Sequence, residues 1–187
     1  VVPRFLRHRS WKGVRRIVVG GGFTDTDHGH RAIHRAAELL QEQEHAVELC
    51  TLRHHPDEGG LIGWVHLAPP ALMRAHDALL AVDIGGTNAR CGIVRTRAAQ
   101  AADMSKADVL VRDKWVHGED DDVTRREHML QGITDMLAGL VRQARNQKLR
   151  LAPFVGVACP GLIREDGCIG SGTQNLPGDW ESEHFHL

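Results

Sequence analysis

A short group of glycine and polar residues, Asp83, Gly85, Gly86, Thr87 and Asn88, follows an apolar run in the middle of the sequence. Glycine backbone comes close to an anion because it carries no side chain. Threonine and asparagine add a hydroxyl and an amide donor, and Asp83 is placed to hold a magnesium ion through water. These residue types fit a phosphate-binding turn, and an ordinary glycine-rich hairpin is the alternative that spacing leaves open.

The segments around this turn predict the elements that position it. Residues 78–96 read ALLAVDIGGTNARCGIVRT, which predicts a strand, a tight turn and a returning strand. A further strand is expected at residues 109–116, and a helix from about residue 123 to 147. The acidic run at residues 119–122 is expected to be a solvated cap of that helix, in preference to a metal site.

The first part of the sequence predicts a strand at residues 16–19, a helix at about 28–43 and a strand at 46–52. Three glycines, Gly20, Gly21 and Gly22, follow the first strand. Such a turn favours a phosphate or leaves room for a flat ring, and a plain tight turn is the alternative.

The next stretch of sequence leads toward the phosphate turn. Residues 56–60 are expected to form a turn, and residues 61–67 a short helix that ends before Pro69 and Pro70.

Two motifs carry a resemblance to a known family. The sequence AVDIGGTNARCGIV at residues 81–94 resembles the first phosphate motif of the ROK family of sugar kinases and repressors, within the actin-like ATPase superfamily. Residues 154–180 contain FVGVACPGLIREDGCI and GTQNLPGDW, which resemble the family's strand, Pro-Gly turn, hairpin and Asn-Leu-Pro-Gly segment beside the sugar pocket.

A third match stands in an unusual order. The sequences RRIVVGGGF at residues 15–23 and HHPDEGGLIGWVHLA at 54–68 resemble the C-terminal part of ROK proteins, yet they precede the phosphate motif. The resemblance therefore implies an α/β fold, an actin-like ATPase (ribonuclease H-like) lobe with a mixed sheet flanked by helices, incomplete or circularly permuted. Residues 1–77 would form the C-terminal nucleotide-side segment, and 78–187 the N-terminal lobe.

The resemblance also implies roles for single residues. The phosphates and magnesium of Mg-ATP would face Asp83, Gly85, Gly86, Thr87, Asn88 and Arg90. The adenosine would be bordered by Gly20, Gly21 and Gly22, and a small-molecule sugar would be bound by Pro160, Gly161, Asn175, Leu176, Pro177 and Gly178. The implied cofactors are ATP and Mg²⁺. No residue is expected to bind the metal directly, and Asp83 would hold it through water.

The implied activity is that of a glucokinase-like sugar kinase of carbohydrate metabolism, which transfers the γ-phosphoryl group of ATP to a hexose hydroxyl. The family's general base, an Asp of an Asn-Asp pair downstream of the Asn-Leu-Pro-Gly segment, is missing before Leu187, and Asp179 is not at its position. The Glu-x-Gly-His sugar motif and the Cys-rich zinc motif are missing as well. We therefore expect no catalytic residue in this chain, which is expected to be a fragment and inactive alone.

A noncatalytic sugar- or nucleotide-binding module, a sensor or regulator, is the main alternative, because it needs no base. A ROK-type repressor is disfavoured, because the first residues lack a helix-turn-helix pattern. An actin-like assembly protein would have no use for the Asn-Leu-Pro-Gly segment.

The composition of the chain limits the kinds of partner that the protein is expected to bind. The net charge of −1 and the dispersed charged residues give no reason to expect nucleic acid, and no apolar run approaches the roughly 20 residues of a membrane span. A cytoplasmic location and a possible homo-oligomer are expected. The four scattered cysteines are expected to be reduced thiols, and His28, His30 and His34 to be surface residues, not zinc ligands.

Overall fold

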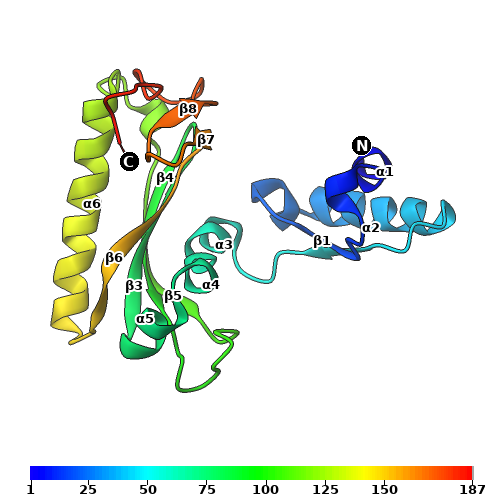
Figure 1. The fold of residues 1–187 in the computed structure, drawn as a ribbon, viewed down its shortest axis with the longest axis horizontal. Coiled ribbons are helices and arrows are strands. Elements are labelled where there is room, and N and C mark those ends of the chain that lie inside the picture. Colours follow the sequence, from blue (N-terminus) through cyan, green and yellow to red (C-terminus); the bar gives the residue numbers. More distant parts are fainter. Residues whose placement is uncertain (187) are drawn as a thin grey trace. The chain divides into compact units, whose positions relative to one another are not determined.

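The computed structural model describes residues 1–186, which fall into two units, residues 1–59 and residues 60–186 (Figure 1). The boundary between the units lies inside helix α3 (Pro56–Ile62). No helix in the described part of the chain is long and apolar enough to cross a lipid bilayer.

The first unit is built around one parallel strand pair, β1 (Arg16–Val19) with β2 (Glu48–Thr51). Its remaining elements are α1 (Val2–Leu6), η1 (Arg9–Trp11), η2 (Gly22–Asp25) and α2 (Asp27–Glu42). Helix α2 begins after Thr26, whose hydroxyl accepts a hydrogen bond from the Gly29 amide at 3.0 Å. The predicted strand at residues 16–19 and the predicted helix that follows it are confirmed.

The second unit contains a four-stranded mixed sheet with the order β5-β4-β3-β6. Its strands are β3 (Ala78–Ile84), β4 (Ala89–Arg95), β5 (Asp108–Trp115) and β6 (Leu151–Ala158). The first three pair antiparallel in succession, whereas β6 pairs parallel with β3 after the crossover through α6 (Arg126–Asn146). The sheet and its helices confirm the predicted α/β class.

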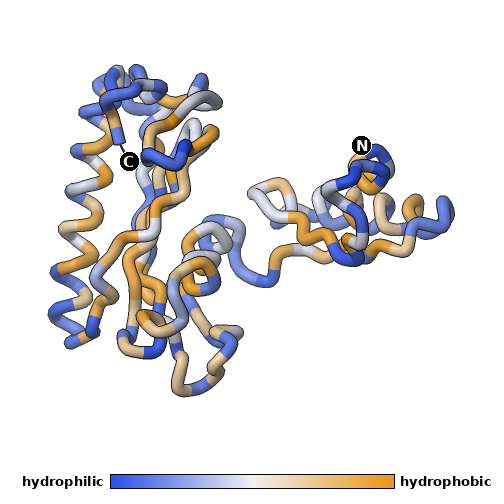
Figure 2. The backbone as a smooth tube through the Cα atoms, in the orientation of Figure 1, coloured by the Kyte–Doolittle hydropathy of each residue, from blue (hydrophilic) through white to orange (hydrophobic). Residues whose placement is uncertain are grey.

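Helices cover both faces of this sheet (Figure 1). Helix α6 packs on one face, against Leu80 and Val82 of β3. Helices α3, α4 (Trp64–Leu67) and α5 (Pro70–Ala75) pack on the other face, which includes Leu79 and Ala81. A strand that is buried on both faces is predominantly apolar, which explains the apolar run of residues 78–82 in β3 (Figure 2).

Two tryptophan rings are seated on glycines of the second unit. A methyl group on Gly156 of β6 would lie 2.3 Å from the Trp64 indole, and one on Gly132 of α6 would lie 2.3 Å from the Trp115 ring. Both glycines therefore allow a close approach between a ring and a backbone that no other residue permits.

The two outer strands of the sheet differ from the inner pair in composition. Strand β5 carries the exposed residues Arg112, Asp113 and Lys114, and β6 contains an exposed proline, Pro153. One edge strand therefore carries three consecutive exposed charged residues, and the other edge strand carries the proline.

The prediction of a turn at residues 56–60 is wrong, because this segment forms the first part of α3. Proline is favourable in a first helical turn, where its missing amide hydrogen is not needed. Asp57 and Glu58 follow it, and their negative charge is favourable beside the positive end of the helix dipole. The two glycines that suggested a turn lie inside the helix, at Gly59 and Gly60.

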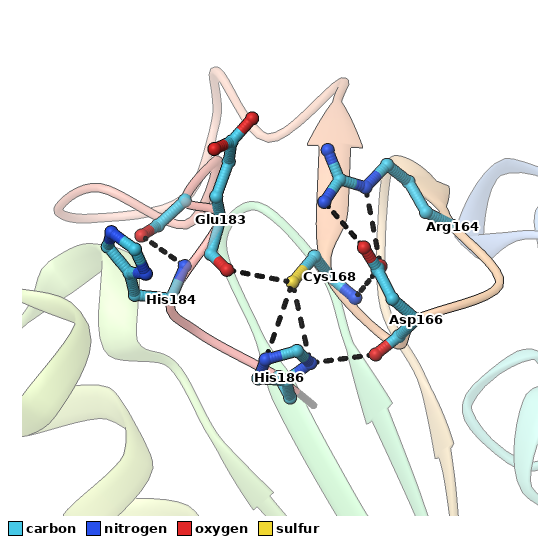
Figure 3. Close-up of polar contacts among 7 residues, drawn as sticks. Arg164, Asp166, Cys168, Glu183, His184 and His186 are labelled. Carbon is cyan, nitrogen blue, oxygen red and sulfur yellow. Dashed lines mark hydrogen bonds and ion pairs between the residues drawn. The ribbon is translucent and has the colours of Figure 1, made fainter.

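The last described residues return to the small hairpin of β7 (Leu162–Ile163) and β8 (Ile169–Ser171), where His186 forms an isolated β-bridge with Cys168. The Cys168 sulfur donates to the Glu183 carbonyl at 3.6 Å and lies 3.5 Å from His186 Nδ1 (Figure 3). The same imidazole nitrogen is 2.7 Å from the Asp166 carbonyl oxygen. These contacts to the buried Cys168 and to Asp166 hold residues 183–186 against the hairpin.

Candidate functional site

The predicted phosphate turn connects the end of β3 to the start of β4. The Gly85 amide donates to the Asn88 carbonyl oxygen at 2.8 Å, which closes the turn. The strand, turn and returning strand expected from the sequence are thus confirmed. The turn places Gly86 and Thr87 at the tip, beyond the last paired residues of the two strands.

An ion pair stands directly below the turn. Asp83 and Arg90 are opposite each other in the strand register, and Arg90 Nη1 lies 3.5 Å from Asp83 Oδ2. Helix α3 also approaches this carboxylate, since a methyl group on Gly60 would lie 3.2 Å from Asp83 Cγ. The positive charge assigned to the rim of the phosphate site therefore lies against the carboxylate assigned to magnesium.

A short helical segment after β5, η3 (His117–Glu119), supports the turn from one side. His117 Nε2 lies 2.9 Å from the Gly85 carbonyl oxygen, so this nitrogen carries the hydrogen. The Gly118 amide donates to the Thr87 carbonyl oxygen at 3.0 Å. His117 is 3% exposed and its ring meets Trp115 edge to face, with 5.8 Å between the ring centroids.

Sequence reasoning missed His117. Strands β3 and β5 both pair antiparallel with β4, so they run in the same direction and end at the same edge of the sheet. A residue that directly follows the third strand of such a meander must lie near the turn that follows the first. That signal was present in the order of the predicted strands.

The Asn-Leu-Pro-Gly segment contacts the turn from the other side. A methyl group on Gly86 would lie 2.7 Å from Asn175 Cβ and 3.3 Å from its carbonyl oxygen. Gly86 therefore allows two segments that are far apart in the sequence to touch. The structure brings together the two motifs that the resemblance assigns to phosphate and sugar.

Hydrogen bonds fix the course of the segment that carries Asn175. The Leu176 amide donates to the Thr173 carbonyl oxygen at 2.8 Å, and the Trp180 indole donates to the Pro177 carbonyl oxygen at 2.9 Å. The amide and hydroxyl of Thr173 donate to the Glu181 carboxylate at 3.1 and 3.0 Å, and these bonds lower the pKa of that carboxyl. The segment is held by its own side chains and backbone.

The same segment is anchored to the start of α6. Gly178 has a φ of +82° and comes so close that a methyl group on it would lie 2.4 Å from the Arg126 amide nitrogen. Arg126 Nη1 donates to the Asp179 carbonyl oxygen at 2.9 Å, and its guanidinium carbon lies 4.1 Å from the centroid of the Phe185 ring. Both the left-handed backbone and the close approach require glycine at position 178.

A hollow of about 300 Å³ lies between the turn, η3 and the Asn-Leu-Pro-Gly segment. This volume is at the lower end of the range of small-molecule sites. Its lining mixes backbone with amide and carboxylate side chains: Gly86, His117, Gly118, Asp120, Val123, Gln174, Asn175, Leu176 and Pro177. Such a lining supplies the donors and acceptors that a ligand with several hydroxyl groups needs.

Several predicted site residues lie outside this lining. Pro160 and Gly161 follow β6, and a methyl group on Gly161 would lie 2.5 Å from the Ser171 carbonyl oxygen. They shape the hairpin beside the Asn-Leu-Pro-Gly segment instead of the hollow itself. Asp120, which was expected to cap a helix, lines the hollow, because α6 begins only at Arg126.

The three glycines assigned to adenosine belong to the first unit. Gly20, Gly21 and Gly22 follow β1, and η2 separates them from α2. Gly21 has a φ of +102°, which side chains rarely adopt, so the turn requires glycine there. Their assignment to adenosine stays a prediction.

The described His, Cys, Asp and Glu side chains determine whether a metal or a thiolate can take part in chemistry. Within residues 1–186, no three His, Cys, Asp or Glu side chains are grouped so that they could hold a metal ion. All four cysteines are free thiols, as expected. Burial raises the pKa of Cys91 to about 12 and that of Cys159 to about 11, so both stay protonated at neutral pH.

No protein-family model matches the chain, and no curated protein is significantly similar to it. The resemblance to ROK proteins is therefore carried by the motifs at residues 15–23, 54–68, 81–94 and 154–180.

Proposed function

We propose that this chain contributes the phosphate and sugar sides of an ATP-dependent sugar kinase of the ROK type, which transfers the γ-phosphoryl group of ATP to a hexose hydroxyl. The contact between Gly86 and Asn175 carries the proposal. One residue belongs to the motif that resembles a phosphate turn, and the other to the motif that resembles a sugar segment. Their meeting beside a hollow of about 300 Å³ is what such an enzyme requires of them.

Phosphoryl transfer depends on positioning and on neutralising the charge of the transferred group. Gly85, Gly86, Thr87 and Asn88 would surround the phosphates of ATP, and Asn175 would bind sugar hydroxyls. His117 would hold the turn in place through the Gly85 carbonyl. Magnesium would be held through water by Asp83, which shares its carboxylate with Arg90, and would supply positive charge beside the phosphates.

The packing of the second unit also supports the proposed actin-like lobe. Leu61 belongs to the segment that resembles the C-terminal part of ROK proteins, and Gly92 to the segment that resembles their N-terminal lobe. A methyl group on Gly92 would lie 2.9 Å from Leu61 Cδ1. Segments that stand in the reverse of the family order thus pack closely together, as one lobe would require.

A noncatalytic binding module is the second candidate, and the Asp83–Arg90 pair favours it. A guanidinium 3.5 Å away competes with a hydrated cation for the same carboxylate. A protein that binds a sugar or a nucleotide without transferring phosphate needs neither that cation nor a base.

Two measurements on the purified chain test the proposal. Calorimetric titration with glucose and with Mg-ATP measures binding, and an enzyme-coupled assay measures sugar-dependent release of ADP. Asn175→Ala is expected to weaken sugar binding by about tenfold, as for the loss of a good hydrogen bond, while Asn146→Ala at the exposed end of α6 serves as the matched control.

The outcomes separate the two candidates. Sugar-dependent ADP release supports the kinase. Binding of both glucose and Mg-ATP without ADP release also supports the kinase, because the chain is expected to lack the catalytic base, whereas binding of only one of the two ligands supports the binding module. Absence of binding to both ligands overturns both candidates.

A further inference from the structure

A second hollow, of about 240 Å³, lies at the opposite end of the four-stranded sheet. It forms where β3 begins and β4 ends, and Arg74, Arg95, Arg97 and Arg150 line it. The seven residues of β3 separate it from the glycine turn by about 20 Å, at roughly 3.3 Å per strand residue. We call it the arginine hollow.

Two of these arginines share one carboxylate. Arg95 Nε donates to Asp108 Oδ1 at 3.2 Å, and Arg97 Nη2 donates to Asp108 Oδ2 at 3.3 Å. Burial raises the pKa of Asp108, but the bonds from Arg97 and Arg95 outweigh this and lower it overall. Both side chains keep about a third of their surface exposed, 32% for Arg95 and 31% for Arg97.

A third arginine has its own partner. Arg150 Nη2 lies 2.9 Å from Asp77 Oδ1, and Asp77 Oδ2 accepts a hydrogen bond from the Arg150 amide at 2.9 Å. With Arg74, four guanidinium groups face two carboxylates at this end of the sheet. The arginine hollow therefore carries a surplus of positive charge that these internal ion pairs do not cancel.

The backbone around the hollow holds these groups in place. Arg97 has a φ of +47°, an unfavourable left-handed conformation that persists only where the surroundings determine it. The neighbouring Thr96 is buried, and its hydroxyl donates to the His76 carbonyl oxygen at 3.1 Å. Ala98 and Ala99 follow, and their small side chains leave the space open.

We propose that the arginine hollow binds a small molecule that carries a dianionic phosphate group. A guanidinium presents parallel donors that match two phosphate oxygens, and several together favour a doubly charged group over a singly charged carboxylate. Arg97 and Arg95 would turn their exposed edges to the phosphate while Asp108 holds their other edges. Arg74 would add a further positive charge beside the phosphate. This site is separate from the glycine turn and does not depend on the proposed kinase activity.

The test measures binding of inorganic phosphate, glycerol phosphate and acetate to the whole chain at constant ionic strength, by calorimetry and by two-dimensional NMR. Both phosphates are expected to bind more tightly than acetate and to shift the resonances of residues 95–99. The double variant Arg74→Gln/Arg97→Gln is expected to weaken phosphate binding by at least about tenfold. Arg142→Gln, which removes the same charge from an exposed position of α6, is the control and should leave binding unchanged.

Two further variants keep the test decisive. Arg74→Gln alone changes a residue near the end of α5 that holds no part of the Asp108 pair, and it should weaken phosphate binding by about threefold even if the double variant fails to fold. Gly86→Ala alters the glycine turn and should leave the phosphate-induced shifts of residues 95–99 intact, whatever it does to phosphate at the turn itself. Phosphate that binds no better than acetate, equal loss in Arg142→Gln, or loss of the shifts of residues 95–99 in Gly86→Ala would each overturn the proposal.

Discussion

The two ends of the four-stranded sheet are built in different ways. At the end that carries Gly86, backbone segments approach one another because glycine leaves room, and the hollow beside them is lined largely by turns. At the end that carries Arg97, long charged side chains reach over the strand ends and face one another. A site made of backbone is sensitive to added volume, whereas a site made of side chains is sensitive to charge. The same sheet thus offers two sites that different substitutions can disrupt separately.

The largest expected effect is a loss of stability at the end of the sheet that carries Gly86. Trp180 is fully buried, and its ring meets Phe185 edge to face with 5.7 Å between the ring centroids. Trp180→Ala should lower the free energy of unfolding of the second unit by about 3–5 kcal/mol, the usual cost of emptying an aromatic site. Urea denaturation followed by circular dichroism measures the change. Trp180→Phe, which keeps most of the ring volume, should lose much less, and equal losses would show that the ring does not support the segment.

The next effect compares two glycines. Gly86→Ala places a methyl group 2.7 Å from Asn175 Cβ and should cost about 1–3 kcal/mol, as overpacking does. Gly139→Ala on α6, where the nearest atom would be 3.9 Å away, should stabilise the protein by up to about 1 kcal/mol through helix propensity. Thermal denaturation of both variants measures the difference. Two changes of the same sign would mean that the contact between the turn and Asn175 is loose.

A smaller effect distinguishes the arginine end by its dependence on pH. The arginine partners hold the pKa of Asp108 below its ordinary value of 3.8, against the opposing effect of burial. Their stabilisation is therefore complete above pH 3.8 and is lost as the pH falls through the lower pKa of the folded state. Urea midpoints measured between pH 6 and pH 2.5 should fall less steeply in Asp108→Asn than in the unmodified protein. An identical acid slope in the two proteins would contradict a role for this ion pair in stability.

The smallest effect is expected in the middle of the sheet. Cys91 lies in β4 between the two ends, and burial raises its pKa to about 12. Its reaction with a thiol reagent at pH 8 therefore requires the sheet to open. After correction for each variant's measured loss of unfolding free energy, Gly86→Ala and Arg97→Gln should both leave this reaction as slow as in the unmodified protein. Labelling faster than that loss accounts for, in either variant, would mean that the ends are coupled through the strands.

Most of the elements could be predicted from the sequence, because their signals are local. The apolar run of β3 and the glycines after it identified the strand and turn, and Met129, Ile133 and Leu140, spaced at helical intervals, form the buried face of the helix predicted at about 123–147. The error at residues 56–60 arose because paired glycines usually mark a turn. In α3 the packing around Gly60, next to Asp83, outweighs that preference.

The candidate site could be predicted only in part. Gly86 and Asn175 were named from motifs, and each motif is continuous in the sequence. His117 and Asp120 have no such motif, and their positions follow from the directions in which β3 and β5 run. The arginine hollow could not be predicted either, because its residues come from the ends of separate strands and helices and meet only in the folded sheet.

The two outer strands have a consequence for how this protein behaves in a concentrated solution. An open strand edge is a template on which another chain can add a strand. Arg112, Asp113 and Lys114 on β5 bring alternating charge to one edge, and Pro153 removes a backbone donor from β6. Proteins use charge and proline in this way to prevent strands of neighbouring molecules from joining edge to edge. The two edge strands thus protect the sheet against aggregation.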